Sequence, residues 1–204
     1  MSDFDEKALH WDQNQMHLQR TRAVAREMLN HIPVNPSMKA LEFGAGTGLL
    51  SFFLKDYFSG ITLMDTSMEM LKMAETKLTA GDKGKIETLF FDLEESTYDQ
   101  KRFDIVFTQM VLHHIKDVNA ILQKFYAMLL PGGYLAIADL YSEDGSFHDP
   151  GVEVHHGFDI TELIHQVETC GFQVIDDRQC FIIRKETKPG TAREYPVFLL
   201  TAKK

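Results

Sequence analysis

Leu41-Glu42-Phe43-Gly44-Ala45-Gly46-Thr47-Gly48 has the form of a buried strand that ends in a glycine-rich turn and opens a helix. Glycines at alternate positions remove the Cβ atoms that would hold a nucleotide-like ligand away from the main chain, and they allow the positive φ angles of a tight turn. Asp65 follows a second apolar run, residues 60–64, and lies 17 residues after Gly48. At the end of the neighbouring strand its carboxylate would accept hydrogen bonds from a ribose diol. The stretch therefore predicts a site for a ligand that contains a nucleoside.

The spacing of the glycines differs from that of a dinucleotide site. A dinucleotide fingerprint reads G-x-G-x-x-G, whereas this chain reads Gly44-x-Gly46-x-Gly48 with leucine at position 49. Acidic residues also stand at the predicted strand ends, namely Glu42, Asp65, Asp92 and Asp139. An edge lined with carboxylates is unfavourable for a pyrophosphate, but it suits a ligand with hydroxyls, an exocyclic amine and a positive charge.

In the order of its motifs, the chain resembles the class I S-adenosylmethionine-dependent methyltransferases from about Lys39 to Leu140. Residues 40–48 resemble the first motif of that family and residues 63–67 the second. Residues 90–93 resemble the third motif, residues 103–115 the fourth strand and the turn beyond it, and residues 129–137 the turn before the fifth strand. Because all of these segments come in the family's order, the resemblance is more specific than the glycine-rich turn alone.

The resemblance implies a cofactor, S-adenosylmethionine, with S-adenosylhomocysteine as product, and it implies which residues hold it. The glycines of the turn would contact the amino-acid tail through their backbone, with the ammonium near Glu42. Asp65, followed by Thr66, would hold the ribose, while the Asp92 carboxylate and the Leu93 N–H would hold the adenine. A polar contact to cofactor or substrate is expected at the end of the fourth strand. The predicted cofactor residues are Glu42, Gly44, Gly46, Gly48, Asp65, Thr66, Asp92, Leu93 and Gln109.

Apolar runs alternate with helical patterns along most of the chain, which predicts an α/β fold with a parallel sheet. The expected strands are 39–43, 61–64, 86–91, 103–108 and 134–139, and the expected helices are 16–30, 47–57, 67–79, 117–130 and 161–170. The tail reads as a hairpin of residues 172–184 and 194–201 around Pro189-Gly190. By resemblance, its outer arm inserts antiparallel beside the fifth strand. The expected result is a doubly wound, Rossmann-like sheet of seven strands, mostly parallel with one antiparallel strand, and with helices on both faces.

We expect a single methyltransferase domain over residues 1–204, in four parts. Residues 1–37 form an N-terminal helical arm or lid, and residues 38–140 form the cofactor-binding core. Residues 141–158 are polar, contain histidines and show neither the helix nor the strand repeat of apolar residues, so we expect a loop on the acceptor side. Residues 159–204 add a helix and the hairpin. Little chain remains for a separate recognition domain, which favours a small-molecule acceptor over a polymer.

Composition excludes several other classes of function. A formal charge of −9 disfavours a nucleic-acid surface, since phosphate contacts need basic patches. No apolar stretch reaches the roughly 18 residues of a membrane span, and the acidic N-terminus lacks the features of a signal peptide. The two cysteines show no metal-like or disulfide-like spacing. We therefore expect a cytoplasmic protein that binds neither nucleic acid nor membrane.

Methyl transfer from a sulfonium is an in-line displacement, so the protein mainly aligns the acceptor and excludes water. A general base becomes useful for a hydroxyl or protonated amine, and His114 and His156 are the candidates for that role. Structural roles for these histidines and for their neighbours His113 and His155 are the alternative. We expect no metal site, because adjacent histidines rarely share one ion and no cysteine or glutamate spacing supports one.

Two alternatives to a small-molecule methyltransferase remain on sequence grounds. One is a binding or regulatory protein that keeps the cofactor pocket but transfers nothing. The other is an NAD-dependent oxidoreductase, since these enzymes also begin with a glycine-rich turn. Methyltransferases for oxygen, nitrogen, carbon and sulfur acceptors all share these cofactor motifs, so the accepting atom is left open.

Overall fold

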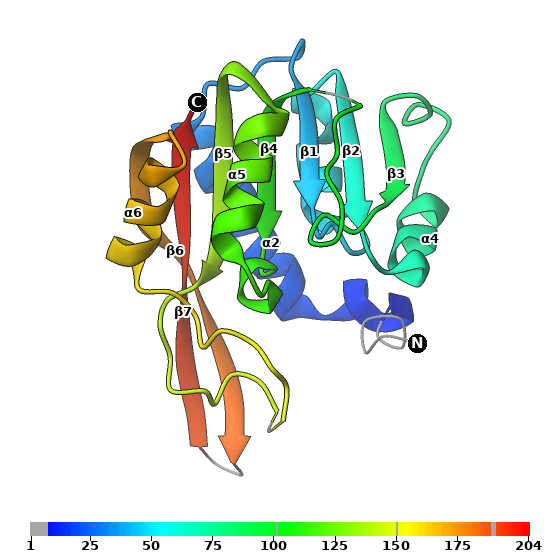
Figure 1. Cartoon of the computed structure of the whole chain (residues 1–204). Helices are drawn as coiled ribbons and strands as arrows, with labels where there is room; N and C mark the ends of the chain where they lie inside the picture. Colours follow the sequence, from blue (N-terminus) through cyan, green and yellow to red (C-terminus); the bar gives the residue numbers. More distant parts are fainter. Residues whose placement is uncertain (1–7, 101, 150, 189–190) are drawn as a thin grey trace.

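The computed structural model describes residues 8–100, 102–149, 151–188 and 191–204. A seven-stranded sheet with the order β3-β2-β1-β4-β5-β7-β6 organises the chain (Figure 1). Strands β1 to β5 pair in parallel, and β7 runs antiparallel to both of its neighbours, β5 and β6. This confirms the predicted fold class, including the single antiparallel strand. The predicted Pro189-Gly190 turn lies outside the described residues.

The elements follow one another as the alternating sequence pattern predicts. In the first half of the described chain they are η1 (Ala8–Gln13), α2 (Gln15–His31), β1 (Lys39–Phe43), α3 (Leu49–Leu54), η2 (Lys55–Tyr57), β2 (Gly60–Asp65), α4 (Met68–Thr76) and β3 (Ile86–Phe90). The second half contains β4 (Phe103–Gln109), η3 (Leu112–His114), α5 (Val118–Met128), β5 (Leu129–Leu140), α6 (Ile160–Thr169), β6 (Gln173–Lys188) and β7 (Thr191–Lys203). Asn14, Ser67, Asp117 and Asp159 cap helices through their side chains, as polar N-cap residues do.

Alternate residues of each central strand point to opposite faces of the sheet, and each face carries its own core. In β1, Leu41 and Phe43 belong to the core that α5 and α6 cover, whereas Ala40 belongs to the core covered by α2, α3 and α4. Both cores consist mostly of fully buried aliphatic and aromatic side chains. The sheet is therefore held from both sides, which leaves its strand ends as the places for function.

Strand β5 begins at Leu129, five residues earlier than the sequence predicts, and the predicted helix 117–130 ends at Met128. Pro131, Gly132 and Gly133 read as a turn in isolation, but their backbone has partners at the end of the chain. Gly132 N–H donates to the Lys204 carbonyl at 3.1 Å, and Lys204 N–H donates to the Gly133 carbonyl at 2.9 Å. These long-range bonds extend the ladder through the predicted turn.

The carboxyl ends of the parallel strands form one edge of the sheet, and three segments gather there. We call this the carboxyl edge, defined by Phe43, Asp65, Gln109 and Leu140 at the ends of β1, β2, β4 and β5. Figure 1 shows η1 and α2 (blue) beside this edge, and the segment after β5 (yellow) running along the part of the β6–β7 hairpin that projects past the sheet. Among the described residues, no helix has the length and apolar character to cross a membrane.

Candidate cofactor and acceptor site

The glycine-rich turn after β1 is a close-fitting backbone loop. Gly44, Gly46 and Gly48 have φ angles of +66°, +55° and +75°, which other L-residues rarely adopt. A Cβ at position 44 would lie 2.4 Å from Cγ2 of Val111, in the turn after β4. Glycine at this position therefore lets the turns after β1 and β4 come into contact at the carboxyl edge.

Asp65, at the end of β2, accepts two backbone hydrogen bonds that fix this turn. Its Oδ2 accepts from Gly46 N–H at 2.6 Å, and its Oδ1 accepts from Ser67 N–H at 2.7 Å. A carboxylate has about four lone-pair sites, so it can accept from the hydroxyls of a ribose as well as from backbone N–H groups. The predicted ribose acid thus lies at the carboxyl edge, half-buried, and also supports the backbone of the glycine turn.

Glu42 lies beneath the turn and is 3% exposed. Its Oε2 accepts from the Ser51 hydroxyl at 2.5 Å and from Ser51 N–H at 3.1 Å, so the carboxyl group is tied to α3. Burial away from water raises the pKa of Glu42 to about 8, although the two Ser51 hydrogen bonds act in the opposite direction. A cation beside Glu42 would favour the ionised form of the carboxyl group, and the expected cofactor carries two such cations, the sulfonium and the ammonium.

The residues predicted to hold the adenine lie beyond β3. Asp92 is exposed, and its Oδ1 accepts from Glu94 N–H at 2.9 Å and from Glu95 N–H at 3.3 Å, which stabilises the turn. Leu93 is buried, and its carbonyl accepts a hydrogen bond from Lys124 Nζ at 2.5 Å. Thr66 is exposed next to Asp65. The turn that carries Asp92 is therefore held in place by contacts separate from any ligand.

Gln109 ends β4 and links the sheet to the N-terminal helices. Its Nε2 donates to the Thr21 hydroxyl of α2 at 3.0 Å, while its Oε1 is buried and has no hydrogen-bond partner within the part of the chain that the structure describes. A buried acceptor without a partner costs about 1–3 kcal/mol, so a donor such as an ammonium would relieve it. Together with the glycine turn and the acids, this orphaned oxygen fits S-adenosylmethionine.

The N-terminal segment is tied to the glycine turn by Asp12, a contact that the sequence did not reveal. Its two carboxylate oxygens accept from the Thr47 hydroxyl at 2.5 Å and from Lys77 Nζ at 2.6 Å. Trp11 packs on His17 with a ring-centroid distance of 4.3 Å. These contacts hold η1 over the turn after β1 and against α4.

A second polar group lies at the ends of β4 and β5. His113, 1% exposed, points its Nδ1 at Asp139 Oδ1 at 2.6 Å, and Asp139 is itself fully buried. The His114 and His148 rings lie 4.2 Å and 5.0 Å from the His113 ring, measured between centroids. His113, His114 and His148 are called the histidine cluster below. Burial, with a contribution from the charge of His113, lowers the pKa of His148, which favours its neutral form.

The structure places the two predicted bases differently. His114 belongs to the histidine cluster. His156 lies against Gly145, where an added Cβ would meet its ring at 2.8 Å, and is not a member of the cluster. Its neighbour His155 has a bracing role, because its Nε2 bonds to the Ile115 carbonyl at 2.8 Å and its N–H donates to the His113 carbonyl at 2.7 Å.

Arg20 of α2 is not among the predicted site residues, yet it is only 5% exposed. Its Nε has no hydrogen-bond partner among the described residues. Burial lowers the pKa of Arg20 to about 10, at which the guanidinium is still charged at neutral pH. The negative charge of Asp139 favours the charged form of the guanidinium and so acts against burial, in the direction that raises the pKa of Arg20. Basic residues on an amphipathic helix usually form a solvated face, so the sequence favours that role for Arg20 over a buried one.

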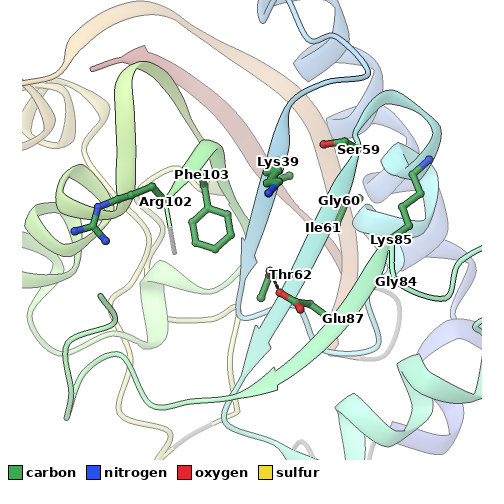
Figure 2. Close-up of a pocket in the computed structure, with 11 residues that line it drawn as sticks. Lys39, Ser59, Gly60, Ile61, Thr62, Gly84, Lys85, Glu87, Arg102 and Phe103 are labelled. Atoms are coloured by element: carbon green, nitrogen blue, oxygen red, sulfur yellow. Dashed lines mark hydrogen bonds between the residues drawn. The ribbon is translucent and has the colours of Figure 1, made fainter. Parts of the chain in front are cut away.

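A cavity of about 340 Å³ opens at the opposite edge of the sheet. Figure 2 shows that its lining comes from the starts of β1, β2 and β4, with Lys39, Gly60 and Phe103 among the residues drawn. Ligands of open α/β sheets bind at the carboxyl ends of the strands. This cavity is therefore separate from the candidate site.

Comparisons with known proteins agree with this geometry. Residues 41–137 match the family model of a methyltransferase domain. Phosphoethanolamine N-methyltransferase 3 of Arabidopsis thaliana is 26% identical over 155 residues, which are 74% of this chain and 30% of the plant protein. The chain thus spans less than a third of the length of that relative.

Two solved structures share the fold. A chain in the complex between the Haloferax volcanii Trm112 methyltransferase activator and a methyltransferase matches with a TM-score of 0.78 at 18% identity, over 100% of this chain and 97% of that one. The N-methyltransferase NodS of Bradyrhizobium japonicum, in complex with S-adenosyl-L-homocysteine, matches with a TM-score of 0.69 at 17% identity, over 94% and 89% of the two chains. Residues 41–137 therefore form a methyltransferase domain, and the chain has the fold of the two solved methyltransferases.

Proposed function

We propose that the protein transfers the methyl group of S-adenosylmethionine to a small-molecule acceptor at the carboxyl edge. The observation that carries this proposal is the placement of two polar sites on one edge. The glycine turn, Asp65 and Gln109 Oε1 form one site, and Arg20, Asp139 and the histidine cluster form the other. The cofactor supplies an electrophilic methyl group, and the chain binds and orients the two reactants.

Two covering segments support a small acceptor. The described part of the N-terminal arm, residues 8–37, is anchored on the glycine turn by Asp12, and the acceptor-side loop is anchored on η3 through His155 N–H. We propose that these segments exclude water from the reacting atoms. A small acceptor with an acidic group would pair with the buried guanidinium of Arg20, and the phosphoethanolamine methyltransferases of plants give one example of such acceptor chemistry.

Two experiments on the full chain test the proposal against its alternatives. Equilibrium titration with S-adenosylmethionine and with NAD should give binding of the first alone; tight NAD binding with none of S-adenosylmethionine would favour an oxidoreductase. Incubation with methyl-labelled cofactor and a fractionated metabolite extract should give a labelled product of low mass. Cofactor binding without any labelled product would favour a regulatory protein instead.

Asp65→Ala should weaken cofactor binding by about 1.5–3 kcal/mol, roughly 10- to 150-fold, because a charged hydrogen-bond acceptor is lost. The change should also lower stability, since Gly46 and Ser67 lose their acceptor. Calorimetric titration with S-adenosylhomocysteine measures the affinity. The control is Asp56→Ala at an exposed position in η2, which should leave the affinity unchanged. If Asp65→Ala binds S-adenosylhomocysteine as tightly as the unaltered protein, Asp65 does not bind the ribose.

His114→Ala and His156→Ala separate the acceptor site from the cofactor site. We propose both residues as acceptor-side groups, so each change should reduce turnover more than cofactor affinity. The effect should be larger for His114, because it lies in the histidine cluster while His156 is exposed against Gly145. Turnover and affinity are measured on the same preparations. Equal and slight losses in both quantities would assign a purely structural role to the two side chains.

A further inference from the structure

The histidine cluster brings three imidazoles together from two separate segments. His113 and His114 stand on η3, directly after β4, and His148 comes from the acceptor-side loop. One ring nitrogen of each residue lies within 4.8 Å of one from each of the others. The ring centroids of His114 and His148 are 5.2 Å apart. Although His113 and His114 are adjacent in sequence, the short turn of η3 places their rings side by side, so adjacency does not prevent them from facing a common point.

Asp139 orients the buried member of the cluster. Because Asp139 Oδ1 lies 2.6 Å from His113 Nδ1, the carboxylate favours the tautomer with its proton on Nδ1, in which Nε2 is the nitrogen able to ligate an ion. Asp139 also accepts from the backbone N–H groups of His113 and Leu140, at 3.3 Å and 2.8 Å. A carboxylate that fixes the tautomer of an imidazole in this way is the usual outer partner of a histidine that ligates a metal.

His148 is held beside this pair with a buried nitrogen that lacks a partner. Its Nε2 is shielded from solvent and makes no hydrogen bond to any described residue. The loop that carries it is fixed at the preceding residue: Lys185 Nζ donates to the Phe147 carbonyl at 2.7 Å, and the Phe147 ring packs on Tyr195 at 5.1 Å. An unsatisfied buried nitrogen is unfavourable, and a bound ion would offset that cost.

We propose that His113, His114 and His148 bind one divalent transition-metal ion. Three imidazole ligands suit zinc, copper, iron or nickel, and they do not suit magnesium or calcium, which take oxygen ligands. Zinc–nitrogen bonds of about 2.0–2.1 Å put the nitrogens of a tetrahedral site about 3.4 Å apart, so the rings close in by rotation on binding. The half-buried positions of His114 and His148 leave room for that rotation. Asp139 supplies a compensating negative charge next to the site.

Three protein ligands leave a coordination position open, as in catalytic zinc sites. If methyl transfer to a small acceptor is correct, this open position would take an oxygen, nitrogen or sulfur atom of that acceptor and favour its deprotonated form. This consequence rests on the proposed function, whereas metal binding itself does not. The test therefore reads the metal directly, without cofactor or acceptor.

The experiment uses the tag-free full chain after chelator treatment and dialysis. Titration with Co²⁺ should give visible absorption bands that saturate at one equivalent, and calorimetric titration with Zn²⁺ should give the same stoichiometry. In His148→Ala and in His114→Ala we expect binding at least about tenfold weaker. The control variant is His165→Ala, which removes an exposed histidine on α6 and should bind like the unaltered protein.

Folding is checked apart from metal binding by the affinity for S-adenosylhomocysteine and by the thermal midpoint of unfolding. His113 is not substituted, because its burial against Asp139 makes it part of the core. Zn²⁺ should raise the midpoint of the unaltered protein and of His165→Ala, and should raise that of His148→Ala by clearly less. An unaltered protein that binds no more metal than His148→Ala would overturn the proposal, even if methyl transfer is found.

Discussion

Gly44→Ala is expected to lower the free energy of unfolding by about 2–5 kcal/mol and to weaken cofactor binding at least tenfold. A positive φ of 66° costs a residue with a Cβ about 1–2 kcal/mol. The new Cβ would also lie 2.4 Å and 2.6 Å from the two γ-methyl groups of Val111, and 3.0 Å from its Cβ. Rotation of Val111 does not relieve the third contact, so the backbone after β4 must move. Chemical denaturation and calorimetric titration measure the two effects.

Gly84→Ala is the matched control, because Gly84 has a φ of +80° and nothing within 4 Å of an added Cβ. Gly84→Ala should lower the free energy of unfolding only by the cost of a Cβ at positive φ, about 1–2 kcal/mol, and should leave cofactor affinity unchanged. The double variant Gly44→Ala/Val111→Ala removes the two shortest contacts and should recover part of the stability and affinity. If Gly44→Ala behaves like Gly84→Ala in both measurements, the contact between the turns after β1 and β4 does not matter. Glycine at position 44 would then be needed only for its positive φ angle.

The positions of the candidate cofactor residues could be predicted from the sequence because the signals are local. The run 41–48 combines a buried strand with a glycine turn, and Asp65 follows directly on its own strand. The parallel register of β1 with β2, in which Phe43 pairs with Met64, then brings Asp65 to Gly46 without any further information. The hydrogen bonds of Glu42 to Ser51 could not be predicted, since they depend on the path of α3.

The acceptor side could not be predicted because its geometry depends on distant contacts. Segment 141–158 shows no helix or strand repeat of apolar residues. The position of His148 depends on the contacts of Phe147 with Lys185 and Tyr195, which lie 37 and 47 residues beyond His148 in the chain. Asp139 was recognised as an acid at a strand end, but its pairing with His113 requires the register between β4 and β5 and the turn of η3. Likewise, the early start of β5 depends on backbone bonds to the last residue of the chain.

Glu42→Gln is expected to stabilise the protein at pH 8 while weakening cofactor binding. The folded-state pKa of Glu42, about 8, is above the reference value of 4.5, so between these pH values the folded state holds a proton that the unfolded state releases. Stability from this group is present below pH 4.5 and falls as pH rises to 8, by about 1.4 kcal/mol per pH unit. Glutamine removes this loss, which amounts to roughly 3–5 kcal/mol at pH 8.

Denaturant unfolding at pH 5 and pH 8 checks this sign. The advantage of Glu42→Gln over the unaltered protein should be small at pH 5 and large at pH 8. Glu168→Gln, at an exposed position on α6, should change stability equally at both values. An advantage of Glu42→Gln that does not grow with pH would mean that the carboxyl group loses its proton in the folded protein as readily as in the unfolded chain.

Cofactor affinity decides why an acid is kept at this costly position. A cationic ligand beside Glu42 stabilises its ionised form, so part of the burial cost is recovered only when the ligand is bound. Glutamine keeps an oxygen for Ser51 but cannot take the negative charge, and S-adenosylmethionine should therefore bind about tenfold or more weakly to Glu42→Gln. If affinity is unchanged while stability rises, Glu42 serves only to hold Ser51 and the start of α3. If both change together, the buried carboxyl group lowers the stability of the free protein and contributes to cofactor binding.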